Sequence, residues 1–92
     1  MILEFIKRFQ RPDTITTFTE GCCYWFAYIL ASRFNGIIMY NEIDNHFGCL
    51  ILGDIYDITG KIDNNNFVVW EHYQDFEPSN SYRVENQCIN IV

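Results

Sequence analysis

The fold is decided by residues 19–36, which read TEGCCYWFAYILASRFNG. Thr19 is a residue type that caps helices, and Glu20 complements the positive end of the helix dipole. Asn35-Gly36 supplies a residue for the left-handed conformation that ends helices. Between these signals one apolar stripe recurs at helical spacing, formed by Cys23, Phe26, Ala27, Leu30 and Phe34. The stretch therefore predicts a central helix that is buried on more than one side.

The residues before this helix predict one further helix and a loop. Apolar side chains recur at helical spacing over residues 2–9, and Pro12 lies just beyond them. We therefore expect a short amphipathic helix that packs as a lid on the core. Residues 13–19 are rich in Thr and show no periodic pattern of useful length, which predicts a connecting loop.

The residues after this helix predict a small, mostly antiparallel sheet. Its strands are expected at runs rich in β-branched and aromatic residues, which are 37–40, 46–52, 55–59 and 67–70, with candidate edge strands at 82–84 and 89–92. Gly53-Asp54 is a hairpin signal, and Pro78 marks residues 74–81 as a loop. The order of two helices followed by a sheet predicts the α+β class, with the helices on one face of the sheet.

Length and composition predict a single domain that spans residues 1–92. A chain of 92 residues is short for two domains, and its 49% hydrophobic and 17% aromatic content favours a core that needs no disulfides. The N-terminus lacks the pattern of a secretory signal peptide, and the adjacent Cys22 and Cys23 are poorly placed to bridge each other. We therefore expect reduced thiols and a cytoplasmic location.

The charge and the apolar runs limit the partners that we expect. The net charge is −6, which opposes direct binding to nucleic-acid phosphates and to anionic membranes and favours neutral or basic partners. The longest apolar stretch, residues 22–31, is about half the length of about 20 residues that a membrane-spanning helix needs. We therefore expect neither a membrane span nor a nucleic-acid complex.

The cysteines at the start of the central helix are candidates for chemistry. A thiol attacks carbonyl carbons as the thiolate, and the positive end of a helix is one of the devices that lower a thiol pKa. Cys22 and Cys23 both lie there, but only Cys23 lies on the stripe that should face the sheet. Cys23 is therefore the candidate nucleophile and His46 the candidate base. The backbone N–H groups of Cys22 and Cys23 are candidates for stabilising an oxyanion.

A third polar residue is needed to orient His46, and Asp57 is the first candidate. Strand alternation places both side chains on one face of the expected hairpin. A turn centred on Leu52-Gly53 puts Asp57 diagonal to His46 at about 7 Å, within reach of a hydrogen bond. A turn centred on Gly53-Asp54 puts them too far apart. The register, and the choice between Asp57 and Thr59, stay open.

Three short motifs carry a resemblance to known proteins. They are GCCYWFA at residues 21–27, Asn45-His46, and YDITG at residues 56–60. In this order they resemble the papain-like superfamily in its NlpC/P60 and transglutaminase-like branches. They are also similar to small uncharacterised proteins of phages and gut bacteria. The resemblance covers under half of the chain, and the order of the motifs carries more weight than any one of them.

The resemblance implies a minimal papain-like fold and a cysteine hydrolase or acyl-transfer enzyme. Cys23 would be the nucleophile, His46 the base and Asp57 the orienting residue. The substrate would be a small amide or ester, of peptide or isopeptide type, because the chain is short for a peptide-binding cleft. If the chain is encoded by a phage, the implied location is the cytoplasm of the host cell.

Two other interpretations stay beside this one. A non-catalytic inhibitor or binding protein of a phage or mobile element could retain the papain-like shell and bind a host protein. Metal binding would draw on the Cys and His side chains, which are Cys22, Cys23, His46, Cys49, His72 and Cys88. Strand alternation puts His46 and Cys49 on opposite faces, and no second pair has zinc-site spacing. We therefore expect no metal and no cofactor, and leave open whether the protein is an enzyme.

Overall fold

The sheet occupies the centre of the molecule. The structure is a computed structural model that describes residues 1–19 and 23–89. Its five strands pair in the order β4-β3-β2-β1-β5, and every pairing is antiparallel. Their bounds are β1 Ile37–Asn41, β2 His46–Ile51, β3 Asp54–Asp57, β4 Gly60–Ile62 and β5 Phe67–Val69. The predicted α+β class is confirmed.

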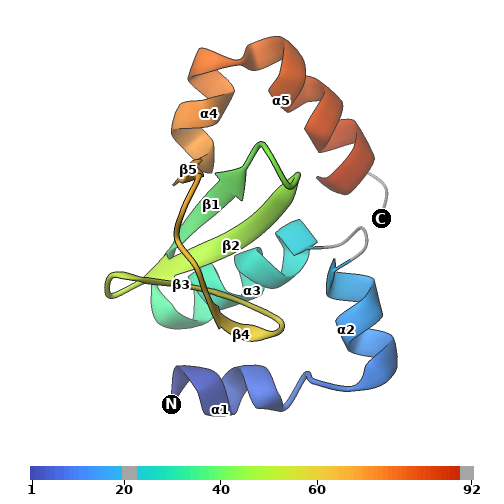
Figure 1. Ribbon diagram of the computed structural model, residues 1–92, viewed down its shortest axis with the longest axis vertical. Helices are drawn as coiled ribbons and strands as arrows, with labels where there is room; N and C mark the ends of the chain where they lie inside the picture. Colours follow the sequence, from blue (N-terminus) through green and yellow to red (C-terminus); the bar gives the residue numbers. More distant parts are fainter. Residues whose placement is uncertain (20–22, 90–92) are drawn as a thin grey trace.

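The helices lie around this sheet (Figure 1). They are α1 Ile2–Lys7, α2 Pro12–Thr19, α3 Cys23–Phe34, α4 Trp70–Phe76 and α5 Pro78–Val84, and a π-helical turn, η1, follows at Glu85–Ile89. Helix α3 lies against the sheet with β2 as its main neighbour, whereas α4 and α5 lie near the end of β1. Within the described ranges, no helix is long and apolar enough to cross a membrane.

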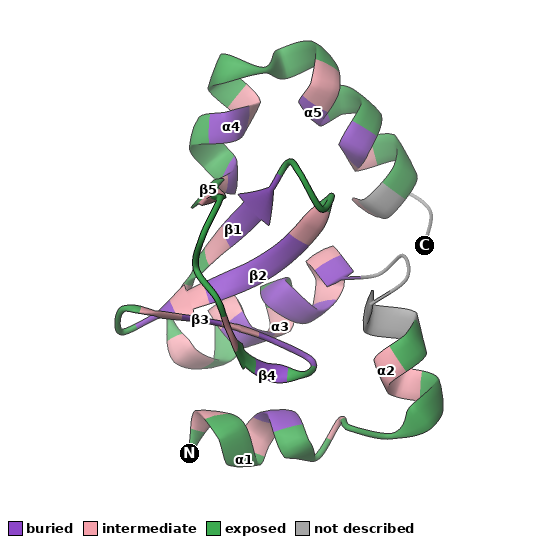
Figure 2. Ribbon diagram, viewed as in Figure 1, coloured by how far each residue is buried: buried purple, intermediate pink, exposed green. Residues whose placement is uncertain are grey.

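The core lies between α3 and the sheet. Phe26, Ala27 and Leu30 are almost fully buried on α3, as the stripe at helical spacing predicts, and Figure 2 shows this buried face turned toward β2. Tyr40 and Phe47 face each other across β1 and β2 on the same side of the sheet. Burying each of the large side chains in this layer contributes roughly 1.5–3 kcal/mol, so the layer holds α3 firmly against the sheet.

Helix α3 is predicted well at its C-terminal end. Asn35 adopts the left-handed conformation with φ 56°, and the N–H of Gly36 donates to the carbonyl of Ala31 at 3.2 Å. The predicted cap at the other end is wrong, because Thr19 is the last residue of α2 and α3 begins at Cys23. Glu20 lies outside the described residues.

The prediction of a loop over residues 13–19 is wrong. Pro12 does not stop α1; it occupies the first position of α2, where its missing N–H costs nothing. Asp13 follows in the first turn, and the Thr16 hydroxyl donates to the carbonyl of Pro12 at 3.0 Å. Because Ile15 packs against the core, tertiary contacts stabilise a helix that the Thr-rich sequence does not favour.

The C-terminal predictions are also wrong. Residues 74–76 and 78–84 are helical in α4 and α5, Trp70 starts α4 instead of ending a strand, and Ile89 lies in η1. The buried residues recur three apart, as Trp70 and Tyr73 in α4 and as Ser81 and Val84 in α5, which is helical spacing. Pro78 is at the helix start. Residues 90–92 lie outside the described part, and β4 was not predicted.

The hairpin between β2 and β3 has the turn centred on Leu52-Gly53. Ile51 pairs with Asp54 and Cys49 with Tyr56, so the register continues to Asp57 opposite Gly48. Leu52 and Gly53 both have positive φ, at 50° and 89°, as a tight hairpin turn with the native twist requires. The structure therefore adopts the first of the two registers, which brings Asp57 near His46.

Candidate functional site

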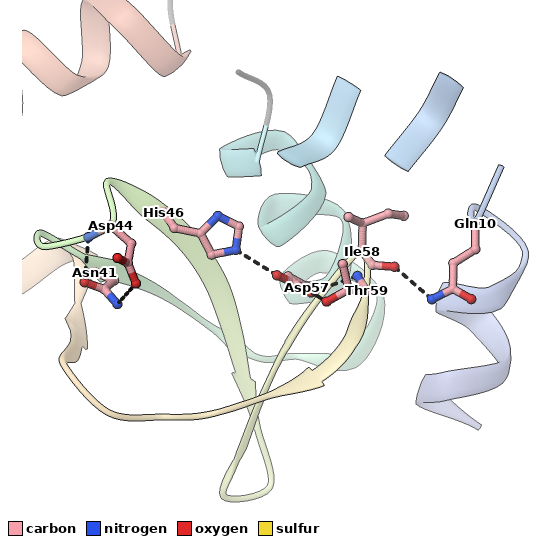
Figure 3. Close-up of polar contacts among 7 residues, drawn as sticks. All are labelled: Gln10, Asn41, Asp44, His46, Asp57, Ile58 and Thr59. Carbon is pink, nitrogen blue, oxygen red and sulfur yellow. Dashed lines mark hydrogen bonds and ion pairs between the residues drawn. The ribbon is translucent and has the colours of Figure 1, made fainter. Parts of the chain in front are cut away.

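His46 and Asp57 form a close pair at one end of the sheet. His46 is the first residue of β2, Asp57 is the last residue of β3, and His46 Nε2 lies 2.7 Å from Asp57 Oδ2 (Figure 3). Both side chains are mostly buried, with 21% and 11% of their surfaces exposed. The hairpin register produces this contact, because it puts the two residues diagonally opposite on one face.

Asp57, and not Thr59, is the hydrogen-bond partner of His46, and Thr59 in turn bonds to Asp57. The backbone N–H and the hydroxyl of Thr59 both donate to Asp57 Oδ1, at 2.8 Å and 2.5 Å. Oδ2 is thereby left for the imidazole. The sequence pattern Asp57-Ile58-Thr59 is that of an Asx turn, in which a carboxylate accepts a bond from the N–H two residues on. This signal was present in the sequence and was missed.

A further contact ties this region to the N-terminal helices. The side-chain amide of Gln10 donates to the carbonyl of Ile58 at 3.0 Å, across 48 positions of sequence. Ile58 is fully buried between Asp57 and Thr59. Figure 3 shows Gln10 reaching the loop that carries this triplet. The connection between α1 and α2 therefore fixes the backbone that orients Asp57, which no local pattern predicts.

Cys23 is the first residue of α3 and contacts the same imidazole. Its thiol is 5% exposed, and it is a free cysteine. Asp57 accepts a hydrogen bond from the imidazole, and the side chain of Cys23 lies within hydrogen-bonding reach of the same ring. The imidazole of His46 therefore has both a carboxylate and a thiol as neighbours.

The electrostatics of this group favour a charged imidazole. The hydrogen bond with Asp57, then that with Cys23, raises the pKa of His46 to about 9, although burial opposes the change. Burial raises the pKa of Asp57, but the bonds from His46 and Thr59 outweigh burial and leave this pKa lowered. At neutral pH an imidazolium therefore faces an aspartate on one side and Cys23 on the other.

A polar pocket of about 390 Å³ opens beside the pair. Its walls come from β1, from the β1–β2 turn and from residues 62–67, and its lining residues are Asn41, Asp44, His46, Asp57, Ile62, Asp63, Asn65, Asn66 and Phe67. β4 and β5 lie at opposite edges of the sheet, so the connection 63–66 has to cross a face of the sheet. It crosses the face of His46 and Asp57, and so encloses them.

Gly48 provides the clearance that the pair needs. It lies between His46 and Leu50 on β2, opposite Asp57. A Cβ at this position would lie 2.7 Å from Ile55 Cγ2 and 3.3 Å from the carbonyl of Tyr56. A side chain at residue 48 would therefore require Ile55 or the backbone of β3 to shift.

The other candidate residues are not part of this cluster. Cys49 is fully buried, and burial raises the pKa of its thiol to about 11, so it is an unreactive core residue at neutral pH. Cys22, with its candidate oxyanion N–H, lies outside the described residues. Among residues 1–19 and 23–89, no three His, Cys, Asp or Glu side chains are grouped to hold a metal ion.

Fold and site together define a small α+β protein with a Cys-His-Asp cluster at the start of its central helix. The chain belongs to the Phage YunG-like protein family, whose model matches residues 2–91. No curated protein and no solved structure matches it. The match supports the phage part of the resemblance drawn from the sequence, whereas the papain-like part stays a hypothesis.

Proposed function

We propose that this phage-type protein is a cysteine hydrolase or acyl-transfer enzyme acting on a small amide or ester bond. The observation that carries the proposal is that His46 Nε2 lies 2.7 Å from Asp57 Oδ2 while the same ring lies within hydrogen-bonding reach of Cys23. A nucleophile, a base and an orienting carboxylate in contact is the arrangement that thiol acyl transfer requires. It also supports the suggested relation to papain-like enzymes.

The chemistry follows from the charge states. Because His46 is already protonated, the Cys23 thiol releases its proton to solvent, and the thiolate beside the imidazolium attacks the carbonyl carbon. The carbonyl π electrons move to oxygen, where the N–H at the start of α3 can stabilise the oxyanion. When the carbonyl re-forms, the bond to the leaving amine or alcohol breaks, and His46 gives its proton to the leaving group. The now neutral His46 takes a proton from water or an amine, which attacks the thioester carbon and displaces the Cys23 thiolate, while Asp57 keeps the ring oriented.

A simple ester tests the proposal. The wild-type protein should release p-nitrophenol from p-nitrophenyl acetate and form an acetyl adduct on Cys23, detected by mass spectrometry of the intact and digested protein. Cys23→Ser and His46→Ala should lower the rate by about 100-fold or more, the range of nucleophile and acid–base contributions. Cys49→Ala is the matched control and should keep the activity. Equal rates in Cys23→Ser and wild type would refute the enzyme hypothesis.

A non-catalytic binding protein is the second candidate, and the burial of Cys23 favours it. The thiol is 5% exposed and does not line the pocket beside His46. The same cluster could then serve to hold α3 against the hairpin. If Cys23→Ser folds and leaves every effect on host cells unchanged, inhibition by binding is the better account. If it abolishes the effect in a folded protein, binding alone fails.

A further inference from the structure

A second hollow lies away from the Cys23 cluster, between α3, β1 and the C-terminal helices. It has a volume of about 760 Å³. Its walls combine aromatic, aliphatic and acidic side chains, among them Tyr24, Tyr28, Ile37, Ile38, Trp70 and Glu71. We propose that this groove, named here the β1 groove, binds an extended basic peptide segment that adds a strand beside β1.

The edge of β1 supports the proposed geometry. β5 is three residues long and pairs only with residues 39–41 of β1, after which the chain turns into α4 at Trp70. No strand in the described ranges pairs with Ile37 and Ile38 on this side. Ile37 is 48% exposed although it lies in a strand. An extended segment could therefore continue the row of β5 and pair with the free edge, as peptides do in strand addition.

The walls offer side-chain contacts to such a segment. Tyr24 and Tyr28 lie one turn apart on α3 and stack at 6.4 Å between ring centroids. Ile37, Ile38 and Val69 supply aliphatic surface beside them. Alternate side chains of an added strand point to opposite faces of the sheet. One set of alternate side chains of the added strand would contact this apolar wall, and the other set would point toward the edge of the groove.

The charge of the groove selects a basic occupant. Among the described residues that line it, Glu71 and Glu85 are acidic and none is Lys or Arg. Glu85 accepts a hydrogen bond from Gln74 at 2.9 Å, which holds its carboxylate at the rim. A second copy of the chain is a poor occupant, because each copy carries a net charge of −6. Lys or Arg side chains would face two carboxylates and, over the aromatic rings, favourable π faces.

Equilibrium binding tests this inference separately from the proposed function. The probe is a fluorescein-labelled octapeptide of alternating Lys and Val, and the protein is the Cys23→Ser variant, so that no turnover alters the probe. The anisotropy should rise with the Lys-Val peptide and stay flat with a Glu-Val peptide. Hydrogen exchange of the backbone amides around residues 36–39 should slow on binding. No rise with the Lys-Val peptide would overturn the proposal.

Two comparisons separate strand addition from unspecific charge attraction. Glu71→Gln and Glu85→Gln should each weaken binding about 3- to 10-fold, whereas Glu4→Gln, an equal charge change on α1, should have no effect. A fully N-methylated Lys-Val peptide, which has no backbone donors, should bind at least about 10-fold more weakly. Equal loss with Glu4→Gln, or equal binding of the N-methylated peptide, would overturn strand addition at the β1 groove.

Discussion

At the scale of single residues, His46 is the centre of the site because each side of its ring has a different partner. Asp57 accepts from Nε2, and Thr59 fixes Asp57 from behind. The ring is thereby held in one orientation, with Cys23 as its second neighbour. A single imidazole between an anchored carboxylate and a helix-start thiol explains both the raised pKa of His46 and the lowered pKa of Asp57.

Removal of the carboxylate should lower the His46 pKa. In Asp57→Asn the largest cause of the raised pKa is lost, so the pKa of His46 should fall by more than about one unit from its value of about 9. An NMR titration of the His46 ring protons measures this pKa directly. The control is Asp63→Asn, because Asp63 lines the same pocket but makes no contact with His46. This variant should leave the His46 pKa within about 0.3 units of its wild-type value. An unchanged pKa in Asp57→Asn would show that the pair does not form.

The pair should also make stability depend on pH. The His46 pKa is raised, so its contribution is fully present below the unfolded pKa of about 6.5 and is lost as pH rises through about 9. The Asp57 pKa is lowered, so its contribution is present above about pH 4 and is lost as pH falls further. The wild type should therefore exceed Asp57→Asn in stability by about 1–3 kcal/mol near pH 5–6, and by less near pH 10. Urea unfolding at both pH values measures this, and a difference that grows toward pH 10 would contradict the account.

At the scale of elements, the β2–β3 hairpin could be predicted from the sequence, but its register could not. Alternation gave the shared face of His46 and Asp57, whereas Gly53 fits either of two turns. The observed turn is centred on Leu52-Gly53 and gives Leu52 a positive φ. Turn preferences do not favour leucine in that conformation, so the sequence did not indicate this register. The central helix was predictable because its stripe and its Asn35-Gly36 end agree. The N-terminal cap of the central helix was not predictable, since Thr19 is the last residue of α2.

The strained turn residue offers a stabilising substitution. Leu52 has φ 50° and is 96% exposed, so it pays a conformational cost without burying surface. Leu52→Asn should stabilise the protein by about 0.5–1 kcal/mol and raise the Tm by roughly 2–8 °C, because Asn-Gly suits this turn. The matched control is Ile43→Asn, which is 74% exposed and has no positive φ. A drop in Tm for Leu52→Asn in thermal unfolding would contradict the observed turn.

Substitution of Gly48 should destabilise the protein, because Ile55 lies close to this position. Gly48→Ala places a Cβ 2.7 Å from Ile55 Cγ2, so β3 has to move or the side chain has to shift. We expect a loss of about 1–3 kcal/mol in urea unfolding, together with a lower His46 pKa, because the strand that carries Asp57 is displaced. If the variant is destabilised but keeps a His46 pKa of about 9, Gly48 has only a packing role.

At the scale of the whole molecule, long-range contacts build the site from segments that local patterns do not connect. α3 packs against the sheet, the connection 63–66 borders the pocket beside His46 and Asp57, and Gln10 ties the connection between α1 and α2 to Ile58. The residue types and their order predicted Cys23, His46 and Asp57 together. The α4–α5 pair was not predicted because Trp70, Tyr73 and Tyr82 are residue types that also occur in strands. The rings of Trp70 and Tyr73 pack against Tyr40, and this tertiary contact stabilises the helix.

The most direct test of the central claim is the pH dependence of alkylation at Cys23 by iodoacetamide, measured by mass spectrometry in a Cys22→Ala, Cys88→Ala background. A thiolate paired with His46 should react at about pH 6 at least about 10-fold faster than in His46→Ala, while the buried Cys49 stays unmodified. Equal rates with and without the imidazole, or no reaction at Cys23 before the protein unfolds, would contradict the account.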